Sequence, residues 1–193
     1  MDIQRPAPQT TFPKDAKRVF QGQIFDVYQW KQKLFDGTEA VFEALRRPDT
    51  VSVIPITPEG KILIVHEEQP NKLPVICFPG GRVESDEDIE VAARRELREE
   101  TGYEAGAMQL WFASQPVSKI DWAFFLLIAK QCVKKNDQRL DAGERITTEE
   151  ISFDRFVTMC TQGIFGDDLA VRMLRATADA GTMAQLNQLF KPL

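Results

Sequence analysis

The sequence has few of the residues that form disulfide frameworks or zinc sites. Only three of its 193 residues are cysteines and only one is a histidine. The cysteines, Cys77, Cys132 and Cys160, lie far apart and form no CxxC pair. An odd number of scattered thiols argues against a disulfide framework and a zinc ribbon. We expect reduced, mostly buried thiols.

Long apolar runs and basic clusters are also missing. The longest apolar run, Trp122 to Ala129, is far below the roughly 18 residues that cross a bilayer. Residues 1–10 contain no apolar core of a signal peptide, so we expect a cytoplasmic protein. With a net charge of -5, the chain has no excess of Lys and Arg to bind nucleic-acid phosphates. We therefore expect neither a membrane nor a nucleic acid as a partner, and an acidic protein that binds phosphates needs a cation.

The composition, 43% hydrophobic and 27% charged, is that of a compact globule of ordinary domain size. Three prolines and scattered charges predict an extended arm or a disordered lead over residues 1–18. Two β-rich runs around Asp36-Gly37 then predict an antiparallel hairpin module over residues 19–48. Residues 49–193 are expected to form the main domain.

The main domain alternates strand-like and helix-like segments. Ser85, followed by Asp88, predicts a helix cap, and Gly102 predicts the end of that helix after Thr101. Residues 134–145 are polar and are expected to form a loop. Strands are expected at 51–56, 61–65, 75–78, 108–114 and 122–131, and helices near 153–161, 167–180 and 182–190. This order predicts an α/β (α+β) sandwich, with a mixed sheet between helices.

The helix expected before Gly102 carries most of the net charge. On a helical wheel, Glu96 and Glu100 fall in the same sector as the apolar residues, and Glu99 lies beside them. Carboxylates crowded at the edge of a core need a divalent cation or a buried arginine as a counter-charge. The alternative is a solvated helix with i,i+4 ion pairs, such as Arg95 with Glu99. Carboxylate clusters suit Mg²⁺ or Mn²⁺, and Gly80-Gly81 would let the backbone approach closely.

The same stretch resembles the Nudix box, G-x5-E-x7-R-E-U-x-E-E-x-G-U, where U is a bulky aliphatic residue. Only Tyr103 departs from the pattern, in the last position. The fixed positions are Gly81, Glu87, Arg95, Glu96, Leu97, Glu99, Glu100 and Gly102. The resemblance implies the Nudix fold and hydrolysis of a nucleoside diphosphate linked to another moiety.

The resemblance also implies roles for individual residues. Glu96, Glu99 and Glu100 would bind Mg²⁺ or Mn²⁺ with a backbone carbonyl at Gly80 or Gly81. Arg95 would orient a carboxylate, most plausibly Glu99, and Glu87 would pair within the loop and helix. Glu144 in the polar loop would ligate metal or act as the general base, with Glu99, Glu149 and Glu150 as alternatives.

Outside the box, the chain is similar to ADP-ribose pyrophosphatases over roughly residues 19–175. This similarity is based on the patterns Phe20-x-Gly22-x-Ile24-Phe25-Asp26-Val27, Asp36-Gly37, Arg46-Arg47-Pro48 and Gly143-Glu144-Arg145-Ile146. This similarity implies a homodimer built through the hairpin. Two positions depart: Gln69 stands where an arginine that contacts phosphate is expected, and Ser114-Gln115-Pro116-Val117 replaces a Ser-Pro-Gly turn. Other nucleotide sugars therefore remain open as substrates.

Four further residues are candidates for substrate binding. Arg46 and Arg47 could clamp phosphate with their guanidinium groups, although strand-end arginines are commonly just exposed. Tyr28 could stack on a base or pack at a dimer interface. Glu84 could contact metal or the diphosphate, or it could be a solvated loop acid.

The leading interpretation is a metal-dependent pyrophosphohydrolase that converts a nucleoside diphosphate sugar, such as ADP-ribose, to a nucleoside monophosphate and a sugar phosphate. A second is a Nudix hydrolase for nucleoside triphosphates, dinucleoside polyphosphates or coenzyme A. A third is a nucleotide sensor without hydrolase activity. Such sensors usually lack some acids of the box, whereas none is missing here.

Overall fold

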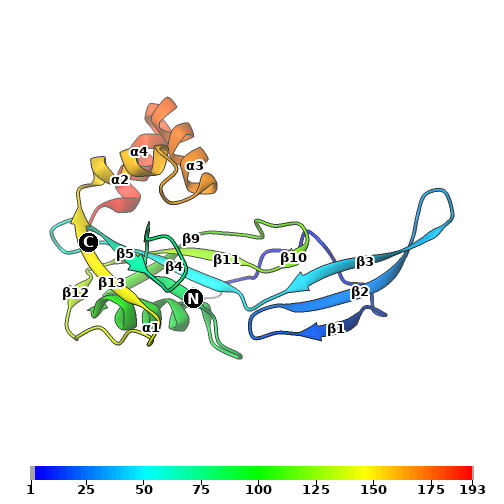
Figure 1. Ribbon diagram of the computed structural model, residues 1–193. Coiled ribbons are helices and arrows are strands. Elements are labelled where there is room, and N and C mark those ends of the chain that lie inside the picture. Colours follow the sequence, from blue (N-terminus) through cyan, green and yellow to red (C-terminus); the bar gives the residue numbers. More distant parts are fainter. Residues whose placement is uncertain (1–2, 193) are drawn as a thin grey trace.

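The computed structural model describes residues 3–192, so the ends of the expected arm (residues 1–2) and of the main domain (residue 193) lie outside the described part. A central sheet of order β7-β4-β11-β9 carries α1 on one face and α2, α3 and α4 on the other, as Figure 1 shows. A second sheet, β1-β2-β3-β10, extends away from this sandwich (Figure 1). The expected mixed α/β sandwich is confirmed.

The strands and helices follow in chain order. The first half contains β1 (Lys17–Gln21), β2 (Asp26–Lys33), β3 (Glu39–Arg46), β4 (Thr50–Pro55), β5 (Ile62–Glu68), β6 (Val75–Cys77), β7 (Gly80–Arg82) and α1 (Ile89–Thr101). The second half contains β8 (Tyr103–Glu104), β9 (Ala107–Ser114), β10 (Ile120–Asp121), β11 (Phe124–Lys130), β12 (Val133–Lys134), β13 (Arg145–Ile151), α2 (Phe153–Thr161), α3 (Asp167–Ala178) and α4 (Ala180–Phe190).

Two central strands divide the interior into two cores. The strand β4 pairs in parallel with β11, and Thr50 lies opposite Phe124. Successive side chains of a strand point to opposite faces. Val53 and Leu127 therefore pack on the α1 side, while Ile54, Ile128 and their neighbours pack under α2 to α4. Burial on both faces explains why β11 is almost continuously apolar.

The N-terminal hairpin forms around Asp36-Gly37, as expected. Gly37 has a φ of 88°, a value that a residue with a Cβ rarely adopts. Asp36 accepts hydrogen bonds from both the backbone amide and the hydroxyl group of Thr38. The added strand β1 begins at Lys17, inside the range expected for the arm.

The segment before β1 has no helix or strand, but it is held against the rest of the protein. Arg5 donates hydrogen bonds to Asp49 and Asp121, each with a shortest distance of 2.7 Å. Gln115 donates to the carbonyl of Pro6, and Phe12 stacks on Tyr28 with ring centroids 5.0 Å apart. The described part of the arm is thus extended and docked.

Two local expectations were wrong. The cap of α1 is Asp88, which accepts from the amide of Glu90, and Ser85 lies in the preceding turn. The helix begins later because Asp86, with a φ of 64°, lies outside the right-handed helical region. The end at Gly102 is as expected, in the left-handed conformation.

The second error concerns the polar stretch before α2. The expected loop ends at Glu144, and Arg145–Ile151 forms the strand β13 along β5. Its pairing partner lies far away in the sequence, so the local pattern does not reveal the strand. No helix within residues 3–192 is long and apolar enough to cross a membrane.

Candidate active site

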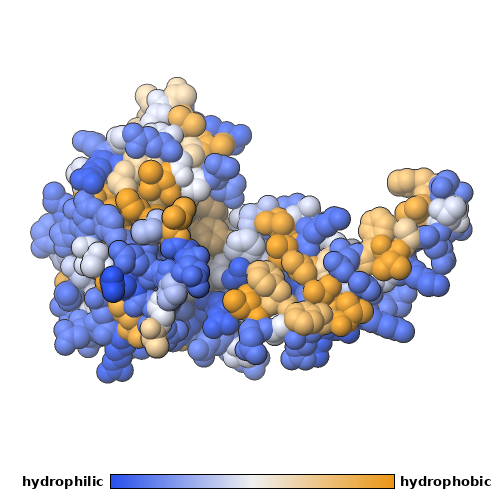
Figure 2. Space-filling view, viewed as in Figure 1, coloured by the Kyte–Doolittle hydropathy of each residue, from blue (hydrophilic) through white to orange (hydrophobic). Residues whose placement is uncertain are grey.

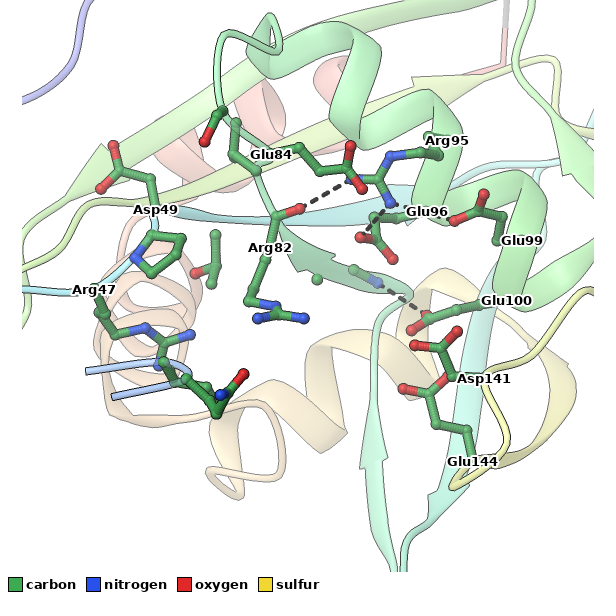
Figure 3. A pocket seen from close by; sticks show the side chains of 18 of the residues that line it. Arg47, Asp49, Arg82, Glu84, Arg95, Glu96, Glu99, Glu100, Asp141 and Glu144 are labelled. Carbon is green, nitrogen blue, oxygen red and sulfur yellow. Dashed lines mark hydrogen bonds and ion pairs between the residues drawn. The ribbon is translucent and has the colours of Figure 1, made fainter. Parts of the chain in front are cut away.

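The helix α1 presents its acids to a large cavity because its apolar side is fixed to the sheet. Ala92, Ala93 and Leu97 are completely buried against β4 and β11. The cavity beside them has a volume of about 1550 Å³. It is lined by Glu96, Glu99 and Glu100 together with residues from several segments between Arg5 and Glu144. The acids expected to share a sector therefore reach one cavity, as Figure 3 shows.

Arg95 holds three carboxylates in place. Its guanidinium donates to both carboxylate oxygens of Glu87 at 2.9 Å, to Glu96 at 2.7 Å and to Glu99 at 3.2 Å. A further N–H bonds the carbonyl of Arg82 at 2.9 Å. The Arg95 side chain is 20% exposed, so these charge-assisted bonds are largely shielded from water. Arg95 thus orients Glu96 and Glu87 in addition to the expected Glu99.

Glu100 is the most deeply placed acid of the cluster. Burial raises its pKa to about 8, opposed by a hydrogen bond from the Gly80 amide at 3.0 Å. The negative charges of Glu96 and Glu144 raise this pKa further. Burial also raises the pKa of Glu96, although Arg95 counteracts that effect. The positive charge around the deepest carboxylates is therefore too small to balance their negative charge.

Gly80 and Gly81 leave room that no other residue would leave. A Cβ at Gly81 would lie 2.5 Å from a carboxylate oxygen of Glu96. A Cβ at Gly80 would lie 2.2 Å from the backbone oxygen of Val51. The strand β7 can therefore lie close to both β4 and the acidic side of α1.

The loop before β13 brings two more acids to the cavity. In the pairing of β13 with β5, Arg145 lies opposite Glu68 at the end of β5. This register places the preceding residue, Glu144, at the cavity, beside Glu100 and Asp141 (Figure 3). Asp141 was missed by the sequence analysis, because nothing in the polar loop distinguishes it from the other acids.

The opposite wall of the cavity is basic, and the two neighbouring arginines on it differ. Arg46 bonds Asp121 at 2.9 Å and lies over the rings of Phe12 and Tyr28. The guanidinium of Arg47 lies near two other aromatic rings, and its buried Nε has no hydrogen-bond partner among the described residues. Arg47 is therefore the more available cation of the pair.

The remaining candidate residues differ in whether they line the cavity. Glu84 lines the cavity, whereas Tyr28 lies outside its lining, stacked with Phe12. Glu149 bonds His66 at 2.9 Å, and Glu150 accepts from the hydroxyl group of Tyr103, so both are engaged away from the cavity. Sequence reasoning did not identify Arg5, Asp49, Arg82, Asp121, Arg139 and Asp141, which also line the cavity.

The donor set fits a divalent cation in its chemistry. Carboxylate oxygens of Glu96, Glu99, Glu100 and Glu144 converge on one side of the cavity, and hard cations prefer such oxygen ligands. Arg95 is the basic residue that contacts this group, and it contacts two of its four members. Among residues 3–192, no three acidic, histidine or cysteine side chains lie close enough together to hold a metal ion as they are placed. The fit therefore rests on the donor atoms and the excess negative charge.

We expect the metal-free protein to lose stability as the pH rises. The folded-state pKa of Glu100 lies above the ordinary value of 4.5, so the folded state keeps a proton that the unfolded chain has released. The free energy of unfolding should therefore fall from about pH 5 through pH 8. Denaturant unfolding in EDTA between pH 5 and 9 measures this slope. The same slope in Glu100→Gln would contradict the assignment to Glu100.

The chain is similar in sequence to known proteins. The family model described as NUDIX domain matches residues 46–159. A methanol dehydrogenase activator of Bacillus methanolicus is 34% identical over 143 residues, which cover 72% of this chain and 77% of that protein. An ADP-ribose pyrophosphatase of Bacillus subtilis is 28% identical over 141 residues, which cover 72% and 76%.

A solved structure supports the same fold. The crystal structure of an ADP compounds hydrolase matches with a TM-score of 0.68 at 17% identity. The match covers 88% of this chain and 95% of that one, so it includes most of the described elements.

Proposed function

Because the chain belongs to the NUDIX domain family and is a Nudix hydrolase, we propose that it cleaves the diphosphate of nucleoside diphosphate sugars, ADP-ribose or a related compound. The products would be a nucleoside monophosphate and a sugar phosphate. The observation that carries this proposal is one cavity with convergent carboxylates on one wall and Arg47 on the other. Such a cavity can take a diphosphate between a cation site and a guanidinium.

In this proposal, Glu96, Glu99 and Glu100 hold Mg²⁺ or Mn²⁺ with a backbone carbonyl at Gly80 or Gly81. When bound, the cation would neutralise charge on the diphosphate and make a water more acidic. The excess negative charge around Glu100, whose pKa is raised to about 8, supports this assignment.

The remaining side chains bind, orient and transfer a proton. Glu144 would take the proton of the attacking water, with Glu99 as the alternative base. Arg95 would keep Glu96 and Glu99 in position, as its hydrogen bonds indicate. Arg47 would bind a phosphate oxygen and Glu84 would contact the diphosphate region, since both line the cavity.

Arg46 and Tyr28 have weaker support as substrate-binding residues. Arg46 lines the cavity, but its guanidinium is already paired with Asp121. Tyr28 lies outside the cavity lining of its own chain. Both residues belong to the N-terminal sheet, so they would contact substrate most readily in a second copy of the chain.

The substrate class draws on two similar proteins whose names mention ADP-ribose and ADP compounds. The test is a product assay with Mg²⁺ on ADP-ribose, UDP-glucose, GDP-mannose, a nucleoside triphosphate and coenzyme A, repeated with EDTA. We expect a nucleoside monophosphate from at least one sugar nucleotide, and none with EDTA. Turnover of the triphosphate or coenzyme A alone would contradict the substrate class. Binding without any turnover would favour the sensor.

The proposal places the enzyme in the cytoplasm as a homodimer. The three cysteines are unpaired in the structure, as expected for a reducing compartment. The N-terminal sheet exposes apolar side chains along its length, seen as orange patches on the extended part of the molecule in Figure 2. They are Val19, Phe20, Ile24, Phe25, Phe35, Val41 and Phe42. Exposed apolar patches of this kind favour an interaction site.

We expect light scattering to give twice the chain mass of 21.9 kDa, and Val41→Asp to give the monomer mass. Val41 is 65% exposed on β3, so a charge there should spare the fold while disfavouring burial at an interface. Val171→Asp on α3, where Val171 is 44% exposed, is the matched control and should leave the mass unchanged. A monomer mass for the unaltered protein would contradict the homodimer.

A further inference from the structure

The acidic cavity contains a second arginine whose charge is not neutralised. Arg82 follows Gly80 and Gly81 at the end of β7, and its exposed side chain reaches into the cavity (Figure 3). Its carbonyl accepts from Arg95, but its guanidinium makes no hydrogen bond or ion pair with any residue in the described range 3–192. Among the arginines that line this cavity, Arg5, Arg46 and Arg95 are ion-paired. Arg139 also lines the cavity, but it comes from the loop that brings Asp141 and Glu144 to the acidic side. Arg82 and Arg47 therefore differ from the ion-paired arginines.

Arg82 and Arg47 lie on the same side of the cavity, with their guanidinium groups toward each other (Figure 3). Burial lowers the pKa of Arg47, and the positive charge of Arg82 lowers it further. Two like charges repel at short range unless an anion lies between them. The free state therefore carries an unfavourable interaction that a bound anion would remove.

Two aromatic rings restrict the direction in which Arg47 can bind. Its guanidinium lies 4.9 Å from the ring of Trp122 and 5.5 Å from that of Phe25. These contacts hold the guanidinium in place, whereas its N–H donors lie along the edge of the group. Nε is buried and unpartnered. A buried Nε has no surface for a ligand, so a charge-assisted contact with a phosphate group would come from the terminal N–H groups.

Gln69 stands where the family resemblance implies an arginine, and it cannot offer a positive charge to a diphosphate. Gln69 donates to Glu67 at 2.5 Å and carries no charge. Arg46, the other nearby cation, is paired with Asp121. On the side of the cavity opposite the carboxylates of α1, Arg82 and Arg47 are the arginines that offer positive charge without an ion pair among residues 3–192.

We propose that Arg82 and Arg47 form a two-guanidinium clamp for the diphosphate of the substrate, with Arg82 as a further binding residue. The clamp faces the carboxylates of α1 across the cavity, so a diphosphate can contact the clamp and the cation site together. This inference rests on the proposed function, since it names the group that recognises the diphosphate. It is tested by binding in addition to turnover.

The test uses inorganic pyrophosphate and ADP as probes in titration calorimetry, with EDTA present. We expect Arg82→Leu to weaken the binding of both by about 10- to 100-fold, the worth of one or two charge-assisted hydrogen bonds. Arg82→Lys should recover only part of the loss, because it restores the charge without the planar fork. Adenosine, which has no phosphate, should bind equally to all variants.

The matched control is Arg175→Leu, which removes the same charge from the last turn of α3 and should leave pyrophosphate binding within twofold. Arg82 is exposed, so its replacement should not unfold the protein, and thermal unfolding checks this. In steady-state assays the clamp predicts that Arg82→Leu raises the KM for the sugar nucleotide. The ratio of this KM to that of the unaltered protein should not change with pH. Unchanged pyrophosphate affinity in Arg82→Leu, or no detectable binding of either probe to the unaltered protein, would overturn the clamp.

The clamp and the proposed function can fail separately. Pyrophosphate binding that depends on Arg82, without hydrolysis of any sugar nucleotide, would uphold the clamp and reject the proposed reaction. Hydrolysis of a sugar nucleotide with equal KM in the unaltered protein and in Arg82→Leu would do the reverse.

Discussion

Exchange of Glu100 for glutamine is expected to lower kcat/KM for the sugar nucleotide by about a thousandfold. A carboxylate that holds a catalytic cation contributes several kcal/mol to the transition state, and about 4 kcal/mol corresponds to three orders of magnitude. The amide keeps the size of the side chain and can still accept the hydrogen bond from Gly80. Steady-state product assays at saturating Mg²⁺ measure the loss.

The same exchange should stabilise the metal-free protein above pH 8. Glu100 is ionised there and buried, with its pKa raised to about 8, whereas glutamine carries no charge to bury. Glu59→Gln, in the exposed turn between β4 and β5, is the matched control and should change neither rate nor stability. Retention of more than a tenth of the activity by Glu100→Gln would contradict the role of Glu100.

Replacement of Arg95 by leucine should cost about 3–5 kcal/mol of unfolding free energy, the usual result of leaving shielded charges without a partner. Glu87 and Glu96 would be affected most by the loss of their partner, since their side chains are only 11% and 13% exposed. For a chain of this size the melting temperature should fall by roughly 10 °C. Thermal and denaturant unfolding at pH 7 measure both quantities.

Arg94→Leu provides the comparison on the same helix. Arg94 pairs with Glu90 four residues earlier, and its side chain is 39% exposed. Such a pair contributes up to about 1 kcal/mol, and Arg94 also donates to the carbonyl of Ala105 at 2.9 Å. Because Arg94→Leu leaves no deeply shielded carboxylate unpaired, the variant should still be more stable than Arg95→Leu. Equal destabilisation by the two replacements would show that Arg95 is an ordinary helix-surface residue. Arg95→Lys should lie between them, since it retains the charge but lacks the planar fork with which Arg95 bonds Glu87, Glu96 and Glu99 together.

The acidic side of the cavity could be predicted because it comes from one helix. A rotation of about 100° per residue relates Glu96 and Glu100 to the buried Leu97 without any knowledge of the rest of the chain. The expected burial of these acids and the family pattern agree with the structure. The capping residue could not be predicted in the same way, because Ser85 and Asp88 are both good caps and only the folded chain shows that Asp86, with a φ of 64°, interrupts the helical path between them.

The basic side of the cavity could not be predicted, because the contacts that distinguish its residues form only in the folded chain. Arg46 and Arg47 are adjacent in the sequence and chemically identical, yet Asp121 pairs with one and leaves the other free. Asp121 lies on β10, which joins the N-terminal sheet beside β3. The strand β13 was missed for a similar reason, since its polar residues form a strand only through pairing with β5.

The parallel pairing of β4 with β11 has a consequence for how the protein is made. During synthesis, β4 emerges from the ribosome long before its partner, since Thr50 must wait for Phe124. Until then α1 has only part of the surface that buries Ala93 and Leu97, and Glu144 has not yet been translated. Chains that stop before β11 should therefore expose apolar surface and depend on chaperones. The order of translation therefore lets Glu144 join the acids of α1 only when nearly three quarters of the sequence has been translated, as residue 144 of 193 marks.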